Sequence, residues 1–147
     1  MRVEQVVARF KTLNSKGVVC FLNGGENLEN IRQIERKLEV QFRDSVTQFW
    51  GTINGLEVTD PQLSLFPLSR MSFDDNLLIF GICNGTVRLA FNTTMKNVAG
   101  EWSIVNAETR YRITYTMQSF WSIHIWTWIV KRRPIWFDAH APQVECD

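Results

Sequence analysis

Two strand-like runs flank the dipeptide Asn84-Gly85, and this arrangement constrains the fold more than any other feature of the sequence. Asn-Gly favours the tight turn of a β-hairpin, because both residues tolerate the positive φ angles that the turn needs. The run before it, residues 77–81, is almost continuously apolar, which is typical of a strand that is covered on both faces. The run after it, residues 86–91, places apolar side chains at every second position. An antiparallel hairpin at the centre of a sheet is therefore expected.

The rest of the chain is patterned for helices at both ends and for short strands between them. Apolar residues recur at helical spacing over residues 3–13, 28–38, 46–53 and 120–131. Asn54-Gly55 is expected to end the third of these helices, and Ser119 to begin the last one. Further strands or extended segments are expected at residues 18–22, 63–66, 102–106 and 110–114.

This order predicts an α+β fold, an antiparallel sheet of about five to six strands with helices packed on one side. The length of 147 residues suits one domain, 1–147. Within it, residues 1–25 are expected to form an N-terminal extension of one helix and one strand, and residues 132–147 a C-terminal tail.

Composition and charge exclude several classes of protein. A formal net charge of +1 gives no strong attraction to nucleic acid or to an anionic membrane. The N-terminus lacks the apolar segment of a signal peptide, and no run approaches the ~18 apolar residues of a membrane span. The cysteines Cys20, Cys83 and Cys146 are odd in number and without metal-ligand spacing, which favours reduced thiols and a cytoplasmic protein.

Residues that could carry catalysis or bind a metal are few. The histidines His124 and His140 have no cluster of cysteines or carboxylates near them in the sequence, whereas zinc needs three or four ligands. The nucleophile and phosphate-loop motifs are absent, and Asn23-Gly24-Gly25 is interpreted as a turn. Asp74-Asp75 could be paired carboxylates for acid–base catalysis, but an exposed turn explains them better. We therefore expect no enzyme, no cofactor and no metal.

Acidic side chains gather in the middle of the chain. Residues 26–75 contain nine acidic and five basic residues. On the functional interpretation, Glu57, Asp60, Asp74 and Asp75 form an acidic face that binds a basic partner such as a nuclease. On the alternative interpretation these are solvated acids in ordinary loops.

The last predicted helix, residues 120–131, is apolar around its whole circumference. Such a helix is either fully buried or uses a second face for another contact. Trp121 or Trp126 could therefore be exposed for a partner or for a homodimer, since tryptophan is enriched at binding hot spots. Alternatively, residues 135–137 fold back and cover the helix.

An ordered series of motifs between residues 26 and 130 resembles the SUKH superfamily, which contains the Smi/Knr cell-wall regulators of fungi and many bacterial immunity proteins. The motifs are Ile31-x-x-Ile34-Glu35-x-x-Leu38-x-Val40 with Phe42, Phe49-Trp50, Asn54-Gly55, Leu65-Phe66-Pro67-Leu68, Leu78-Ile79-Phe80-Gly81, Arg88-Leu89-Ala90-Phe91-Asn92, Ser119-Phe120 and Trp128-Ile129. Arg43, Val46 and Asn92 stand where the family usually has Pro, Tyr and Asp, which indicates a divergent subfamily.

The resemblance implies a non-enzymatic, protein-binding domain. Its expected role is that of an immunity protein, which neutralises a cognate toxin domain, a nuclease or a deaminase, by direct binding. A regulatory or scaffold protein that binds a cellular partner is the first alternative, and a small enzyme with an unrecognised site is the second. No membrane and no direct nucleic-acid contact is expected.

Overall fold

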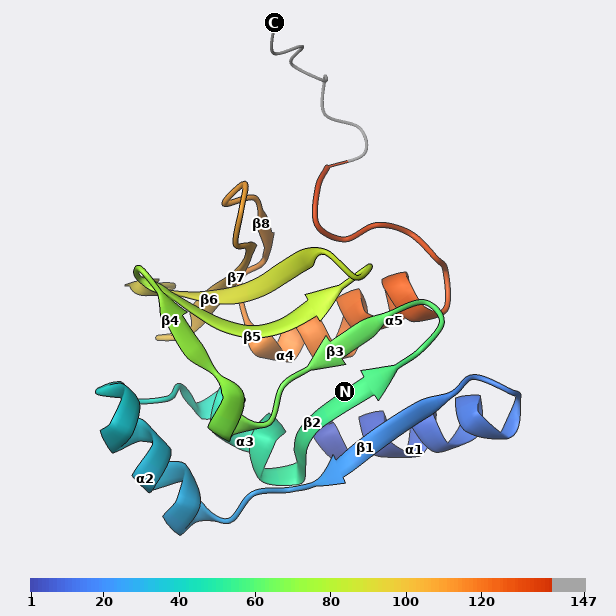
Figure 1. Cartoon of the computed structure of the whole chain (residues 1–147), viewed down its shortest axis with the longest axis horizontal. Coiled ribbons are helices and arrows are strands. Elements are labelled where there is room, and N and C mark those ends of the chain that lie inside the picture. Colours follow the sequence, from blue (N-terminus) through green and yellow to red (C-terminus); the bar gives the residue numbers. More distant parts are fainter. Residues whose placement is uncertain (139–147) are drawn as a thin grey trace, which may run out of the picture.

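A computed structural model describes residues 1–138, and its centre is an antiparallel sheet (Figure 1). Within these residues the strands are β1 (Cys20–Gly24), β2 (Ile53–Val58), β3 (Leu63–Leu65), β4 (Ser72–Asp74), β5 (Leu77–Cys83), β6 (Val87–Lys96), β7 (Trp102–Asn106) and β8 (Arg112–Thr114). Their order in the sheet is β1-β2-β3-β5-β6-β7-β8, and β4 pairs with the first residues of β5, beyond the end of β3. The hairpin of β5 and β6 lies in the interior of this order, as its sequence predicts.

The α+β class is confirmed, and the sheet has eight strands in the described residues where five to six were expected. The two unanticipated strands are β2 and β4. The expected helix end at Asn54-Gly55 is wrong, because α3 (Asp44–Thr52) stops at Thr52 and the chain enters β2 directly. Gly55 lies inside β2 with a φ of +93°, and a Cβ atom there would be 2.7 Å from the Leu65 carbonyl oxygen. Glycine thus permits the close approach of β2 and β3.

The helices begin and end near the predicted positions. They are α1 (Val3–Ser15), α2 (Leu28–Leu38), α3, the short 3-10 turn η1 (Leu68–Arg70), and a last helix formed by α4 (Met117–Ser119), the π-helical η2 (Phe120–His124) and α5 (Ile125–Ile129). The last helix starts earlier than expected, because the Thr116 hydroxyl, and not that of Ser119, caps it and accepts the Ser119 backbone N–H at 3.0 Å.

One face of the sheet is covered by α1, α3 and the last helix, as Figure 1 shows. The core between these layers is rich in aromatic side chains, and its largest fully buried members are Trp50, Trp121, Phe10, Phe49, Phe80, Phe91 and Phe120. The Trp50 indole N–H donates to the Phe66 carbonyl oxygen at 2.8 Å, so the polar atom of this buried ring has a partner. Residues 1–25 are therefore an integral part of the domain, since α1 buries Val3, Val6 and Phe10 in this core.

The opposite face of the sheet, here called the outer face, carries no packed helix in the described residues. A second, smaller apolar cluster lies on it, formed by the strand residues Leu77, Ile79, Ala90 and Val105 with Phe66 and Ala107 against them. The side chains that alternate with these along the strands, such as Leu78, Leu89 and Ile104, point to the helix-covered face and belong to the main core, because successive strand residues point to opposite faces.

The free edge of β1 lies beside the last turn of α1. The Asn14 side chain donates its amide N–H to the Cys20 carbonyl oxygen and accepts the Cys20 backbone N–H, both at 2.9 Å. One amide side chain therefore satisfies both edge-facing backbone groups of Cys20.

Several residues of the motif series hold the connections between elements. The buried Glu35 carboxylate accepts the Phe42 backbone N–H at 2.7 Å and so fixes the link from α2 to α3. Asn54 accepts the Leu68 backbone N–H at 3.0 Å and donates to Glu26 at 3.3 Å. In this chain these residues therefore position backbone segments.

Candidate functional site: the outer face of the sheet

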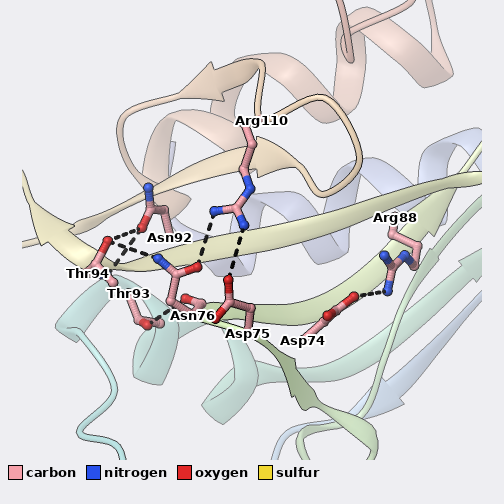
Figure 2. A network of polar contacts seen from close by, with 8 residues as sticks. All are labelled: Asp74, Asp75, Asn76, Arg88, Asn92, Thr93, Thr94 and Arg110. Carbon is pink, nitrogen blue, oxygen red and sulfur yellow. Dashed lines mark hydrogen bonds and ion pairs between the residues drawn. The ribbon is translucent and has the colours of Figure 1, made fainter.

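Two of the acids predicted to bind a partner lie where β4 turns into β5: Asp74 is the last residue of β4, and Asp75 begins the turn. Each is paired within the chain (Figure 2). Asp74 accepts a hydrogen bond from Arg88 of β6 at 2.9 Å. The same guanidinium donates to Glu108, in the loop from β7 to β8, at 2.6 Å. These bonds, the one to Glu108 first, raise the pKa of Arg88 above its ordinary value. Arg88 therefore joins the β4–β5 turn to the β7–β8 loop across the outer face.

A second arginine makes a parallel link. Arg110 lies in the β7–β8 loop with a φ of +64°, and Figure 2 shows its side chain reaching across β6. Its guanidinium donates to the Asn76 side-chain oxygen at 3.2 Å and lies 3.6 Å from a carboxylate oxygen of Asp75. Asn76 in turn donates to Thr94 at 3.3 Å. Nine residues make up what we call the Arg88–Arg110 network. They are Glu108 and the eight residues labelled in Figure 2: Asp74, Asp75, Asn76, Arg88, Asn92, Thr93, Thr94 and Arg110.

The network organises the surface more than it stabilises the fold. Its ion pairs are exposed, and pairs of that kind contribute about 0–1 kcal/mol each. They nevertheless hold the β7–β8 loop above the smaller apolar cluster of the outer face. A basic partner that binds Asp74 or Asp75 would compete with Arg88 and Arg110 for these carboxylates.

The other two acidic residues predicted to bind a partner, Glu57 and Asp60, lie elsewhere. Glu57 is exposed on the outer face of β2 and accepts a hydrogen bond from Ser64 at 2.5 Å. Asp60 follows β2 and pairs with Arg132, beyond the last helix, at 2.7 Å. The structure thus brings Asp74 and Asp75 together beside β5, whereas Glu57 lies on β2, on the other side of β3, and Asp60 follows β2, so the four acids do not form one continuous face.

Two exposed apolar side chains lie at the sheet edge, on β1 and just before it, and sequence reasoning did not select them. Val19 and Phe21 are 66% and 65% exposed. Phe21 is the cross-strand neighbour of Glu57. A signal was present, because residues 18–22 are all apolar. In an edge strand with a single covered face, such a run must expose every second side chain. Periodicity cannot tell which side chains these are.

The prediction that Trp121 or Trp126 is exposed for a partner is wrong. They are 2% and 4% exposed. Trp121 stacks on Phe49 with ring centroids 5.7 Å apart, and its indole N–H donates to the Met1 carbonyl oxygen at 2.8 Å. Trp126 packs against Phe10 under the Arg9 guanidinium. The neighbouring helices α1 and α3 supply this cover.

The alternative, that the following residues fold back over the last helix, is confirmed for the described part of the chain. Ile135 is buried, and Trp136 packs edge-to-face on Trp128 with ring centroids 4.9 Å apart. Phe137 stays partly exposed. The fold-back therefore covers the end of α5.

Titratable groups suited to chemistry are scattered. Across residues 1–138, no three His, Cys, Asp or Glu side chains come together to hold a metal ion. Burial lowers the pKa of His124, because the low-polarity surroundings disfavour its charged form. His140 and Cys146 lie outside the described residues.

Cys83 is expected to resist alkylation in the folded protein. Its side chain is fully buried, and burial raises its pKa to about 12, so the reactive thiolate is scarce at neutral pH. Peptide mapping by mass spectrometry after iodoacetamide treatment checks this prediction, with urea-unfolded protein as the control. Rapid labelling of native Cys83 would contradict the burial of this residue.

Among residues 1–138 no helix combines the length and the apolar character needed to cross a bilayer. Comparison of the sequence with protein-family models and with curated proteins returns no match.

Proposed function

We propose that this chain is a protein-binding domain of the immunity type, which neutralises a toxin domain by direct binding and without chemistry of its own. The binding surface in this proposal is the outer face of the sheet. The order of SUKH-like motifs along the sequence supports the choice of function, and the exposed side chains of the outer face support the choice of surface.

One observation carries the proposal, namely the exposed Phe21 on β1, which is the cross-strand neighbour of Glu57, with the exposed Val19 just before the strand. Aromatic side chains are enriched at the centres of protein interfaces, and charged groups at their rims. Phe21 projects from β1, which is paired with β2, and the Val19 carbonyl oxygen accepts the Thr59 backbone N–H at 3.1 Å. Little backbone conformational freedom would therefore be lost on binding.

The Arg88–Arg110 network supports the same surface at its other end. Its arginines and carboxylates are held in place by mutual contacts before any partner arrives. A charged surface that is ordered in advance favours fast and selective association.

The proposal is tested by capture from the source cells with tagged protein, followed by co-expression of a captured toxin domain with each variant. Phe21→Ser is expected to weaken toxin binding at least tenfold, about the effect of losing an interface hot spot. Ile123→Ser is the matched control, because Ile123 is also an exposed apolar residue but lies in the last helix. Growth protection should fall with Phe21→Ser and persist with Ile123→Ser.

Two results would contradict the proposal. If Phe21→Ser and Ile123→Ser bound the toxin domain equally well, the outer face would not be the contact surface. Capture of a cellular assembly in place of any toxin domain, with no protection in co-expression, would favour the regulatory or scaffold alternative.

A further inference from the structure

A hollow of about 220 Å³ lies on the outer face between the end of β6 and β8. Val105 of the smaller apolar cluster contributes to its lining, and the exposed Met95 and Tyr115 stand beside it. Ligand pockets for small molecules usually measure ~300 Å³ or more. The hollow is therefore better suited to a side chain or two from a partner.

The charges around this hollow have one sign. Lys96, Arg110 and Arg112 line it, and no carboxylate does so among the described residues. Arg110 is turned toward Asp75 and Asn76 of the network. Within residues 1–138, Lys96 and Arg112 have no carboxylate within ion-pair distance.

The side chain of Arg112 is ordered by an aromatic neighbour. The guanidinium carbon of Arg112 lies 3.9 Å from the centroid of the Tyr115 ring, and an N–H of the same guanidinium donates to the Tyr115 hydroxyl. The Tyr115 carbonyl oxygen accepts a hydrogen bond from the Asn97 side chain at 3.0 Å, which ties the residue to the end of β6. A stacked guanidinium loses less freedom when it binds a carboxylate, and it can do so with two parallel N–H groups.

We propose that this hollow receives an acidic segment of a protein partner, with a carboxylate between Lys96 and Arg112 and an apolar neighbour against Met95 and Tyr115. Charge complementarity identifies the occupant, because the hollow offers cationic donors and a partly apolar lining. This inference deepens the proposed function. It rests on that proposal in one respect, namely that the outer face is the binding surface. It adds that the partner carries an acidic segment that binds in the hollow between β6 and β8. This segment is distinct from the basic surface of the partner that the carboxylates of this chain would attract.

A nucleic acid fits the hollow less well. Single-stranded nucleic acid is bound along a continuous basic groove with several stacking rings. Among the described residues, Tyr115 is the one aromatic ring of the lining, and it already stacks with Arg112. Asp74, Asp75 and Glu108 lie along the adjoining network. These carboxylates would repel a phosphate backbone that extended beyond the hollow.

The test is a titration of ¹⁵N-labelled protein with a capped hexaglutamate peptide at low salt, followed by NMR. Saturable shifts are expected at the backbone amides of Lys96, Arg112 and Tyr115. Lys96→Glu/Arg112→Glu should weaken binding at least about tenfold. Lys96→Gln/Arg112→Gln, which removes the charges without reversing them, should weaken it less. Lys131→Glu/Arg133→Glu is the matched control, because it changes the net charge equally at the exposed end of the last helix.

The inference is overturned if the shifts are spread over all exposed basic residues, if they do not saturate, or if the control variant weakens binding as much as the hollow variant. Binding of a thymidine hexanucleotide at the same amides without binding of hexaglutamate would also overturn it, in favour of nucleic acid. The titration contains no toxin, so its failure and a failure of toxin capture are separate results.

Discussion

Trp121→Ala is expected to lower the free energy of unfolding by about 3–5 kcal/mol, the range for removing a large aromatic side chain from a core. Trp121 is almost fully buried, stacks on Phe49 and donates its indole N–H to the Met1 carbonyl oxygen. The substitution leaves a cavity between α1, α3 and the last helix and an acceptor without its donor. Urea denaturation followed by tryptophan fluorescence and circular dichroism measures the change.

Two further variants separate the causes of this effect. Trp121→Phe keeps most of the ring volume and removes the hydrogen bond, so it should be less destabilising than Trp121→Ala. Phe137→Ala removes an aromatic side chain that is partly exposed, and a small change in stability is expected. If Trp121→Ala kept the stability of the wild type but lost a partner, Trp121 would be a binding residue and its burial in the core would be refuted.

Gly25→Ala is expected to lower the free energy of unfolding by at least about 3 kcal/mol, the upper end of the usual range for overpacking. A Cβ atom at position 25 would lie 2.0 Å from the Gly51 carbonyl oxygen and 2.9 Å from the Thr52 Cα atom. Both obstacles belong to the backbone at the end of α3, which cannot rotate away as a side chain could. The neighbouring Glu26 backbone N–H also donates to the Trp50 carbonyl oxygen at 2.9 Å, and this bond would be strained.

The adjacent glycine supplies a matched control. A Cβ atom at Gly24 meets no atom within 4 Å. Gly24→Ala is therefore expected to be neutral or to stabilise the fold by up to about 1 kcal/mol, since alanine reduces the freedom of the unfolded chain. Thermal and urea unfolding of the two variants gives the comparison. Equal stabilities would show that the segment between β1 and α2 does not pass close to α3.

Local sequence patterns correctly predicted the helices and strands that depend mainly on neighbouring residues. The Asn84-Gly85 hairpin and the amphipathic α1 and α2 are examples, because turn chemistry and apolar spacing depend on neighbours in the sequence. β2 escaped prediction for a physical reason. Ile53 continues the helical spacing of apolar residues in α3, so the sequence predicts a helix at the start of β2. Only the pairing of β2 with β1 and β3 identifies it as a strand.

The candidate site was harder to predict, because long-range contacts decide it. Asp74 and Asp75 were selected for their charge, but Arg88 and Arg110, which pair with them, come from β6 and from a loop beyond β7. The exposure of Phe21 depends on β1 being an edge strand with one helix-covered face. Nothing in the local sequence carries that information.

The Asn14 side chain has a consequence for assembly. An exposed strand edge is a template for another strand, and proteins that avoid aggregation cover or interrupt such edges. The Asn14 side-chain amide bonds both the backbone N–H and the backbone carbonyl oxygen of Cys20 that face the edge. It takes the place of a neighbouring strand there and ends the sheet. If two copies of this chain form a homodimer, we expect them to meet through side chains on their surfaces, and not through one sheet that runs from β1 of one copy into β1 of the other.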